Sequence, residues 1–432
     1  MQKAVPARLA GTSMTTLSIG LSVALSAAAT TAHADPQRID YWRTEASHTE
    51  VSAQQEAIDR FNRAQSHWHV EMSRLPAGSY TEAVTAAALA GDLPCVLYID
   101  QPVAPNFAWS GFLRPLDDLI APETLAPLLE TAKATYNGKV YAAGQNEEVL
   151  VLYGRRSVIE AHGIRIATLD APWGQTEFLA ALETLKQSGD FLYPLDIQAG
   201  WTGDEWYSYA FGPWLLSFGA DQIDRDSYLE AEGVLNGGAA EAWGEFFQGL
   251  FEAGYVDRNP SDNRGFDQGR VALNYVGSWE LRNHLAAWGD DLVVMPVPDF
   301  GHGPLIGGGS WQLGISTQCN APEGAAEFVE FLLQPEEIAE TSKARITVPS
   351  HPQAAALTED FREGGRWRFF YDYAEAHARL RPATPGYPTI SSAFERATRD
   401  IRDGRDVLTA LDEAVDAIER DIADNRGYGF HE

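Results

Sequence analysis

Residues 35–100 alternate strand-like and helix-like segments, and this alternation constrains the fold more than any other feature of the sequence. Residues 35–42, 67–75 and 95–100 are strand-like, with apolar side chains that alternate with polar ones or form a short continuous run. Amphipathic helices are predicted around residues 51–61 and 80–89, between these strands. The order strand, helix, strand, helix, strand predicts a parallel sheet covered by helices.

The ends of these strands are the first places to look for a binding site. In open sheets of this kind, ligands collect beyond the carboxyl ends of the strands. These positions follow Trp42, follow Leu75 and include Asp100. Ser47 and Glu50 have the spacing of a capping box, so a helix is predicted to start directly after the first strand.

The rest of the chain extends this pattern. Residues 138–153 form a strand-like segment with polar residues between two apolar runs, as expected for a crossing between two units. Residues 155–300 predict a second α/β unit, and residues 322–333 a further helix. Residues 408–422 repeat apolar side chains at steps of three and four, which predicts an amphipathic terminal helix. The length of 432 residues fits about two to three domains.

The N-terminal segment reads as a secretory signal peptide. Lys3 and Arg8 precede an apolar run over residues 17–29, and an Ala-His-Ala sequence ends at Ala34. Cleavage near Ala34 is expected to release the protein into the periplasm; a disordered cytosolic leader is the alternative. No cysteine stands at the cleavage position, so a lipid anchor there is not expected.

The net charge of the chain argues against one class of partner, and its two cysteines leave one structural question open. The 32 Lys and Arg residues against 61 Asp and Glu residues give a formal charge of −29, which argues against nucleic acid as a partner. Cys95 and Cys319 are the two cysteines of the chain. Each lies in an apolar segment, and a disulfide and a pair of buried thiols are both open at this point.

The sequence carries few signs of catalysis. It contains no phosphate-binding loop, no H-E-x-x-H helix and no G-x-S-x-G nucleophile turn. His67 and His69 share one face of a strand, but a solvated face explains them better than a metal site. Neither a metal nor a cofactor is expected. A glycoside hydrolase stays open, because two carboxylates at the right separation suffice for that chemistry.

Tryptophan is abundant and suits the recognition of sugars. A sugar ring presents an apolar face, which packs on an aromatic side chain, and hydroxyls that bind to carboxylates, amides or guanidinium groups. Most of these tryptophans are expected in the core. Trp279 and Trp311 are stronger candidates for a site, because the sequences VGSWE and GGGSW place each after glycine and serine, where the backbone turns.

Several segments together resemble the family 1 extracellular solute-binding proteins. They are the opening IDYW, LPCVLYID, VGSWE, GGGSWQLGIS with APEGAAEFVEFLL, and RPATPGYPTISSAFERATRDI. This family comprises sugar receptors of ABC importers, including the maltose- and trehalose/maltose-binding proteins, and the resemblance covers essentially the whole mature chain. The chain departs from it at LYGRRS, where many relatives read YYN, and at Cys95, where Asp is usual.

The resemblance implies an α/β, two-lobed periplasmic binding protein fold of the class II type. The hinge would have two or three crossings, and the ligand would lie in a cleft between the lobes. The first lobe would comprise residues 35–147 and 304–350, and the second residues 148–303 and 351–432 with the C-terminal helices. The implied protein is a monomer without catalytic activity, with a sugar or glycoside ligand and the membrane permease of an ABC importer as partners.

The resemblance also implies site residues. Trp279 would stack on a sugar ring from the second lobe, and Gly308, Gly309 and Trp311 would face the ligand from the first. Arg381 would point its guanidinium at the ligand. Trp201 joins the aromatic candidates. Topology adds Glu45, Ser47, His48, Ser79 and Asp100 at strand ends, and Gln145 and Glu147 in the crossing.

Two ligand classes stay open at this point. The first is a neutral sugar of disaccharide or glycosyl-glycerol size. The second is an anionic sulfo- or phosphosugar glycoside, which a guanidinium in the position of Arg381 would bind if it were a lone positive charge.

Overall fold

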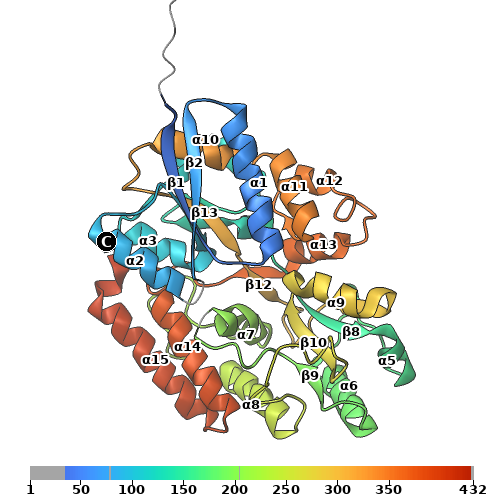
Figure 1. The fold of residues 1–432 in the computed structure, drawn as a ribbon. Helices are drawn as coiled ribbons and strands as arrows, with labels where there is room; N and C mark the ends of the chain where they lie inside the picture. The colour runs from blue at the N-terminus through green and yellow to red at the C-terminus, as the bar shows by residue number, and fades with distance from the viewer. Residues whose placement is uncertain (1–34, 77–78, 204, 430–432) are drawn as a thin grey trace, which may run out of the picture. The chain divides into compact units, whose positions relative to one another are not determined.

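The computed structural model describes residues 35–76, 79–203 and 205–429 (Figure 1). The predicted signal peptide and its cleavage site at Ala34 lie outside the described residues. From Pro36 onward the chain forms one compact unit. Within the described residues, no helix has both the length and the apolar character that a bilayer span requires.

The first lobe is built on a seven-stranded sheet, in the strand order β2-β1-β3-β13-β6-β5 with β4 paired to β13. The strands β1, β2 and β3 pair in parallel, which confirms the predicted strand and helix alternation, whereas β13 enters antiparallel to β3. The strands are β1 (Gln37–Thr44), β2 (Trp68–Leu75), β3 (Val96–Asp100), β4 (Leu113–Arg114), β5 (Lys133–Tyr136), β6 (Lys139–Ala143) and β13 (Trp311–Ser316).

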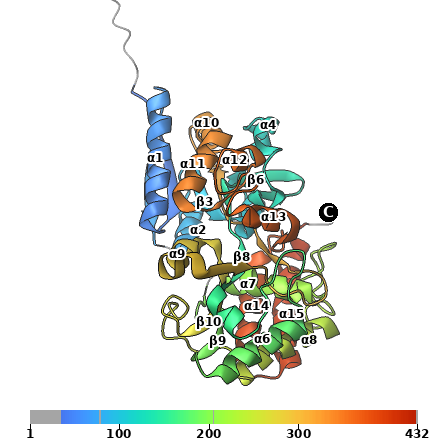
Figure 2. The same cartoon turned by 90° about the vertical axis from the view of Figure 1, so that its right-hand side faces the viewer.

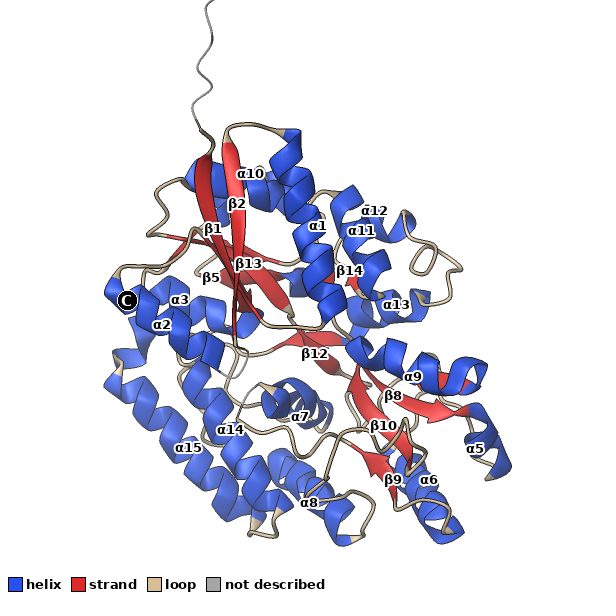
Figure 3. Cartoon of the chain, viewed as in Figure 1, coloured by secondary structure: helices blue, strands red, loops and turns tan. Residues whose placement is uncertain are grey.

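Helices cover this sheet (Figure 3). They are α1 (His48–Ala64), α2 (Tyr80–Ala90), α3 (Ala104–Trp109), α4 (Pro122–Leu125), α10 (Pro322–Leu332), α11 (Pro335–Arg345) and α12 (Pro352–Ala356). The predicted N-cap is present, since Ser47 Oγ accepts a hydrogen bond from Glu50 N at 3.3 Å. The carboxylate of Glu50 pairs instead with Arg43 and Arg345, because two guanidinium groups attract it more strongly than a neutral backbone amide does.

The second lobe is built on a four-stranded sheet in the order β11-β8-β10-β9. Its strands are β8 (Leu150–Arg155), β9 (Tyr193–Asp196), β10 (Val271–Gly277) and β11 (Leu292–Met295). Its helices are α5 (Arg156–Ala161), α6 (Gln175–Ser188), α7 (Trp206–Ser217), α8 (Gly238–Glu252), α9 (Leu281–Trp288), α13 (Arg368–His377), α14 (Tyr387–Arg402) and α15 (Val407–Asp424). Figure 2 shows α6, α8, α14 and α15 grouped around this sheet.

Two short ribbons accompany the passages of the chain between the sheets. β7 (Asn146–Glu147) pairs with β14 (Val348–Pro349), and β12 (Ile306–Gly308) pairs with β15 (Ala378–Leu380). The chain passes from one sheet to the other between β6 and β8, again between β11 and β13, and finally after α12. The residue bounds proposed for the two lobes stay a prediction.

Each lobe has its own apolar core. The largest cluster of buried side chains packs around the second sheet and includes Trp173 and Trp214, each 1% exposed. Two smaller clusters pack against the first sheet. Trp173 and Trp214 therefore have the core role expected of most tryptophans in this sequence, and burial of such large side chains is a main source of stability.

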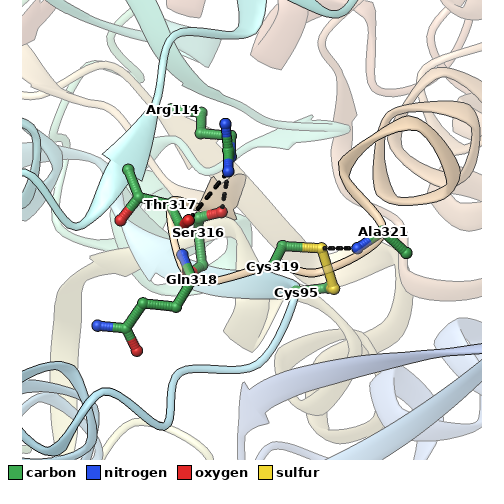
Figure 4. Close-up of a disulfide and its surroundings, with 7 residues drawn as sticks. All are labelled: Cys95, Arg114, Ser316, Thr317, Gln318, Cys319 and Ala321. Atoms are coloured by element: carbon green, nitrogen blue, oxygen red, sulfur yellow. Dashed lines mark hydrogen bonds between the residues drawn. A yellow bond between two sulfur atoms is a disulfide. The ribbon is translucent and has the colours of Figure 1, made fainter.

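A disulfide between Cys95 and Cys319 settles the alternative that the sequence left open, with Sγ atoms 2.02 Å apart (Figure 4). Cys95 immediately precedes β3, and Cys319 follows β13. Arg114 holds the same turn by donating to the carbonyl oxygens of Ser316 at 3.2 Å and Thr317 at 3.0 Å. The bridge therefore fixes the two neighbouring strands at the ends opposite to Asp100 and Trp311, which pair in register.

Candidate functional site

The guanidinium of Arg381 connects the two lobes. Its Nη1 donates to Asp100 Oδ2 at 2.9 Å and to Glu205 Oε2 at 3.0 Å. Its Nη2 donates to Asp100 Oδ1 at 2.9 Å and to the carbonyl oxygen of Gly309 at 2.7 Å. Asp100 is the last residue of β3 in the first lobe, and Glu205 directly precedes α7 in the second. We call Arg381, Asp100 and Glu205 the Arg381 cluster.

Opposite charges hold this cluster together in a buried setting. Arg381 is 5% exposed. Burial lowers its pKa, but the attraction of Asp100 and Glu205 outweighs burial, so the pKa lies well above its ordinary value. Burial raises the pKa of Glu205, against the attraction of Arg381. Tyr387 donates its hydroxyl to Glu205, and Ser391 Oγ donates to Glu205 at 3.3 Å. Arg381 is therefore a paired charge.

An aromatic group of the first lobe adjoins the cluster. Trp311 stacks on Tyr98 with ring centroids 5.6 Å apart and 24° between the planes, and it meets Tyr80 edge-on at 5.7 Å. Trp311 is half-buried and is the register partner of Asp100 across the β13–β3 pair. Strand pairing thus places an indole ring directly beside a carboxylate, the combination that suits a sugar ring and its hydroxyls.

A second aromatic group lies in the second lobe. Trp279 stacks on Trp201 at 6.5 Å and 28°, and meets Trp206 edge-on at 6.2 Å. Tyr209 lies 6.3 Å from Trp279, and its ring centroid is 5.1 Å from Cζ of Arg381. Trp201 and Trp279 are both half-buried. The Arg381 cluster thus contacts the aromatic group of the second lobe through Tyr209, and that of the first lobe adjoins it through the register pairing of Trp311 with Asp100.

Gly308 and Gly309 stand where a side chain would collide with neighbouring residues. A Cβ on Gly308 would lie 2.7 Å from Thr131 Cγ2, and one on Gly309 would lie 2.6 Å from Gln101 Oε1. Gly309 also has a φ of +83°, which side-chain-bearing residues rarely adopt. Its carbonyl oxygen binds Arg381, and its amide donates to Glu147 Oε2 at 3.4 Å. Both polar groups of Gly309 therefore bind protein atoms.

Glu147 is a fully buried carboxyl group in the crossing, with 0% exposure. Burial raises its pKa to about 8, although hydrogen bonds from Thr131 and from the amides of Gly309 and Glu148 act in the opposite direction. Glu148, the next residue, adds repulsion. Glu147 is therefore neutral near pH 7 and ionises in the folded protein only in mildly alkaline solution.

We expect Glu147 to make the stability of the protein fall as pH rises. Its pKa in the folded state is above the ordinary value of 4.5, so its contribution is complete below about pH 4.5 and is lost as pH approaches about 8. Glu147→Gln removes the ionisation and should be more stable than the wild type by at least about 1.4 kcal/mol near pH 9. Urea unfolding across this pH range measures the difference, with exposed Glu56→Gln as control. Parallel pH profiles for wild type and Glu147→Gln would refute this role.

The other predicted residues have varied surroundings. Glu45, Ser47, His48 and Ser79 are exposed, beyond β1 or at the start of α1 and α2. Ser47 caps α1, and His48 Nδ1 lies 3.4 Å from Ser52 Oγ. Gln145 is buried and donates to the carbonyl oxygen of Leu332 at 2.7 Å, inside the first lobe. Among the described residues, no three His, Cys, Asp or Glu side chains are arranged to hold a metal ion.

The sequence reasoning missed Glu205, Tyr98, Tyr209 and Tyr387. Glu205 lies in the aromatic-rich segment GWTGDEWYSY, and its place before a helix full of aromatic residues was the available signal. Tyr98 stands two residues before Asp100, so its side chain lies on the same face of β3. Tyr209 and Tyr387 carry no sequence signal that separates them from core tyrosines.

The sequence of this chain is similar to known extracellular proteins. Residues 56–365 match the family model described as bacterial extracellular solute-binding protein. A relative from Streptomyces antibioticus, described as an uncharacterized lipoprotein in the oleD 5' region, is 26% identical over 355 residues, 78% of this chain and 76% of its own length.

Solved structures share the fold. The GacH receptor of Streptomyces glaucescens matches 90% of this chain and 99% of its own at 20% identity, with a TM-score of 0.75. The cyclic alpha-maltosyl-1,6-maltose binding protein of Arthrobacter globiformis matches 90% and 100% at 22% identity, also with a TM-score of 0.75. MalE of Bdellovibrio bacteriovorus matches 89% and 100% at 18% identity, with a TM-score of 0.73. Because the family model spans most of the chain and the fold is the two-lobed fold of maltodextrin-binding proteins, this chain belongs to the bacterial extracellular solute-binding proteins.

Proposed function

We propose that this chain captures a sugar or glycoside outside the cytoplasmic membrane and delivers it to the permease of an ABC importer. The observation that carries the proposal is the Arg381 cluster with an aromatic group on each side, Trp311 with Tyr98 and Trp279 with Trp201. Relatives in fold support it: the GacH receptor was solved with acarbose, and MalE of Bdellovibrio with maltotriose.

The proposed mechanism is closure of the lobes around the ligand. A ligand that contacts both lobes binds the closed arrangement more tightly than the open one and shifts the population towards it. Each lobe contributes one aromatic group, and each group can pack against one sugar ring. We therefore propose a ligand of disaccharide or glycosyl-glycerol size. The protein acts as a monomer in the periplasm, after removal of its signal peptide, and needs no covalent chemistry.

A thermal-shift screen tests this function. Neutral di- and trisaccharides, polyols, sulfosugars and phosphosugars are each added to the mature protein, since a ligand of the folded state raises the melting temperature. We expect a saturable shift with at least one sugar and no product after prolonged incubation. Turnover of a chromogenic glycoside would instead support a secreted glycoside hydrolase.

Trp279→Ala and Trp311→Ala should each weaken sugar binding at least tenfold, which corresponds to about 1.4 kcal/mol, because each removes an aromatic face from the sugar. Isothermal titration calorimetry with the sugar found in the screen measures the change, and circular dichroism checks that the variants are folded. Trp288→Ala, which alters an indole that packs on Arg155 instead, is the matched control. Unchanged affinity in both site variants would refute the assignment of these two rings.

A further inference from the structure

In the Arg381 cluster, most donors of the guanidinium already have partners, whereas the carboxylates can accept further hydrogen bonds. All four Nη hydrogens of Arg381 have acceptors: two on Asp100, one on Glu205 and one on Gly309. A guanidinium has five donors, and Nε has no partner among the described residues. The carboxylate of Asp100, in contrast, keeps lone pairs, because each of its oxygens accepts one bond from Arg381 and can accept another; Glu205 Oε1 accepts one bond, from Ser391.

The side chains of the cluster also differ in exposure: the two acidic side chains are more exposed than that of Arg381. The side chain of Arg381 is 5% exposed, that of Asp100 14% and that of Glu205 32%. The two acidic side chains are therefore more accessible to a ligand than that of Arg381. With one positive and two negative groups, the cluster carries a net formal charge of −1.

Arg381 also lines a small cavity of about 10 Å³, together with Ser208, Gln222 and the arginines Arg225 and Arg379. This volume is roughly what one water molecule needs. Gln222 Oε1 also lacks a partner among the described residues, so a water there would have polar neighbours. A sulfate or phosphate ester is several times larger than a water molecule.

We propose that Asp100 and Glu205 set the ligand class of this site: they neutralise Arg381 and present only acceptors, so the site selects sugars with hydroxyl or ammonium donors and excludes anionic sugars. This inference rests on the proposed function. Glu205 acts here as a positioning and specificity-determining residue. An ionised sulfate, phosphate or carboxylate donates no hydrogen bond and meets a net negative charge, whereas hydroxyl and ammonium groups supply the donors that the carboxylates accept.

The first test removes the neutralising charges and uses sulfate as the probe. In Asp100→Asn/Glu205→Gln the shapes of the side chains are kept, but Arg381 becomes an unpaired positive charge. We expect saturable sulfate binding to the double variant, at least tenfold tighter than to the wild type, with Glu205→Gln in between. Thermal shift with sulfate against chloride at equal ionic strength measures it. Asp403→Asn is the matched control, because Asp403 pairs with the buried Arg402, and neither residue lines the cavity beside Arg381.

Each outcome decides the proposal. Saturable sulfate binding to the wild type would overturn it, and so would the absence of sulfate binding to the double variant, since removal of both carboxylates would then have exposed no anion site. The second test compares the wild type with trehalose and trehalose 6-phosphate, and with the other matched neutral and phosphorylated sugars of the screen. Preference for a phosphorylated sugar over its neutral parent would overturn the inference. Failure of every sugar to bind would refute the proposed function, while the sulfate test would still decide the role of the two carboxylates.

Discussion

Replacement of both Cys95 and Cys319 by alanine is expected to lower the free energy of unfolding by up to about 5 kcal/mol. The bridge joins residues 224 positions apart, so its loss returns a large amount of conformational freedom to the unfolded chain. Alanine fills part of the buried space without adding a buried hydroxyl. This is the largest effect of a single covalent change that the structure predicts.

Guanidinium chloride unfolding of the double variant and of the oxidised wild type measures this loss. Either single alanine variant should be destabilised like the double variant, because each breaks the same bridge. Sugar affinity should change less than stability, since the bridge lies at the opposite ends of β3 and β13 from Asp100 and Trp311. A loss of less than about 1 kcal/mol would show that the two strands need no covalent link.

Arg345→Met is expected to destabilise the protein by about 3–5 kcal/mol. Arg345 ends α11 and pairs with Glu50 and Glu148 at 3.2 Å each. Glu148 is buried in the crossing and also accepts a hydrogen bond from Ser278 Oγ at 2.5 Å. Glu50 retains Arg43 in the variant, but Glu148 is left as an uncompensated buried charge.

The direction in which the stability of Arg345→Met changes with pH tests whether the buried charge of Glu148 causes the loss. Burial raises the pKa of Glu148, and Arg345 acts against burial. Without Arg345 that pKa rises further, so the variant should recover stability as pH falls and Glu148 takes up a proton. The second replacement in Arg345→Met/Glu148→Gln should restore part of the loss at neutral pH. Lys343→Met, which breaks an exposed pair with Glu340 on the same helix, should cost less than about 1 kcal/mol. An equal loss in both single variants would contradict this account.

Local patterns in the sequence were sufficient to predict the first three strands of the first lobe and the two helices between them. The alternation over residues 35–100 predicted the parallel strands β1, β2 and β3, because the order of strands and helices restricts how they can pair. The antiparallel entry of β13 from a distant part of the chain has no local signal. The disulfide follows from that entry, since only the pairing of β13 with β3 brings Cys319 to Cys95.

The candidate site was predictable where a residue follows a backbone turn. Glycine and serine before Trp279 and Trp311 mark them in the sequence, and both are half-buried members of aromatic groups. The sequence left open whether Arg381 is a lone charge, and the structure pairs it with Asp100 and Glu205, which lie 281 and 176 residues away in the chain. A single sequence contains no information on such a pairing.

Calorimetric titration of the mature protein with the sugar found by thermal shift tests the central claim most directly. The account predicts saturable binding of one sugar per chain, loss of that binding in Trp279→Ala and Trp311→Ala, and recovery of the sugar chemically unchanged. Absence of binding by every sugar of the screen, or conversion of the sugar to a product, would contradict it.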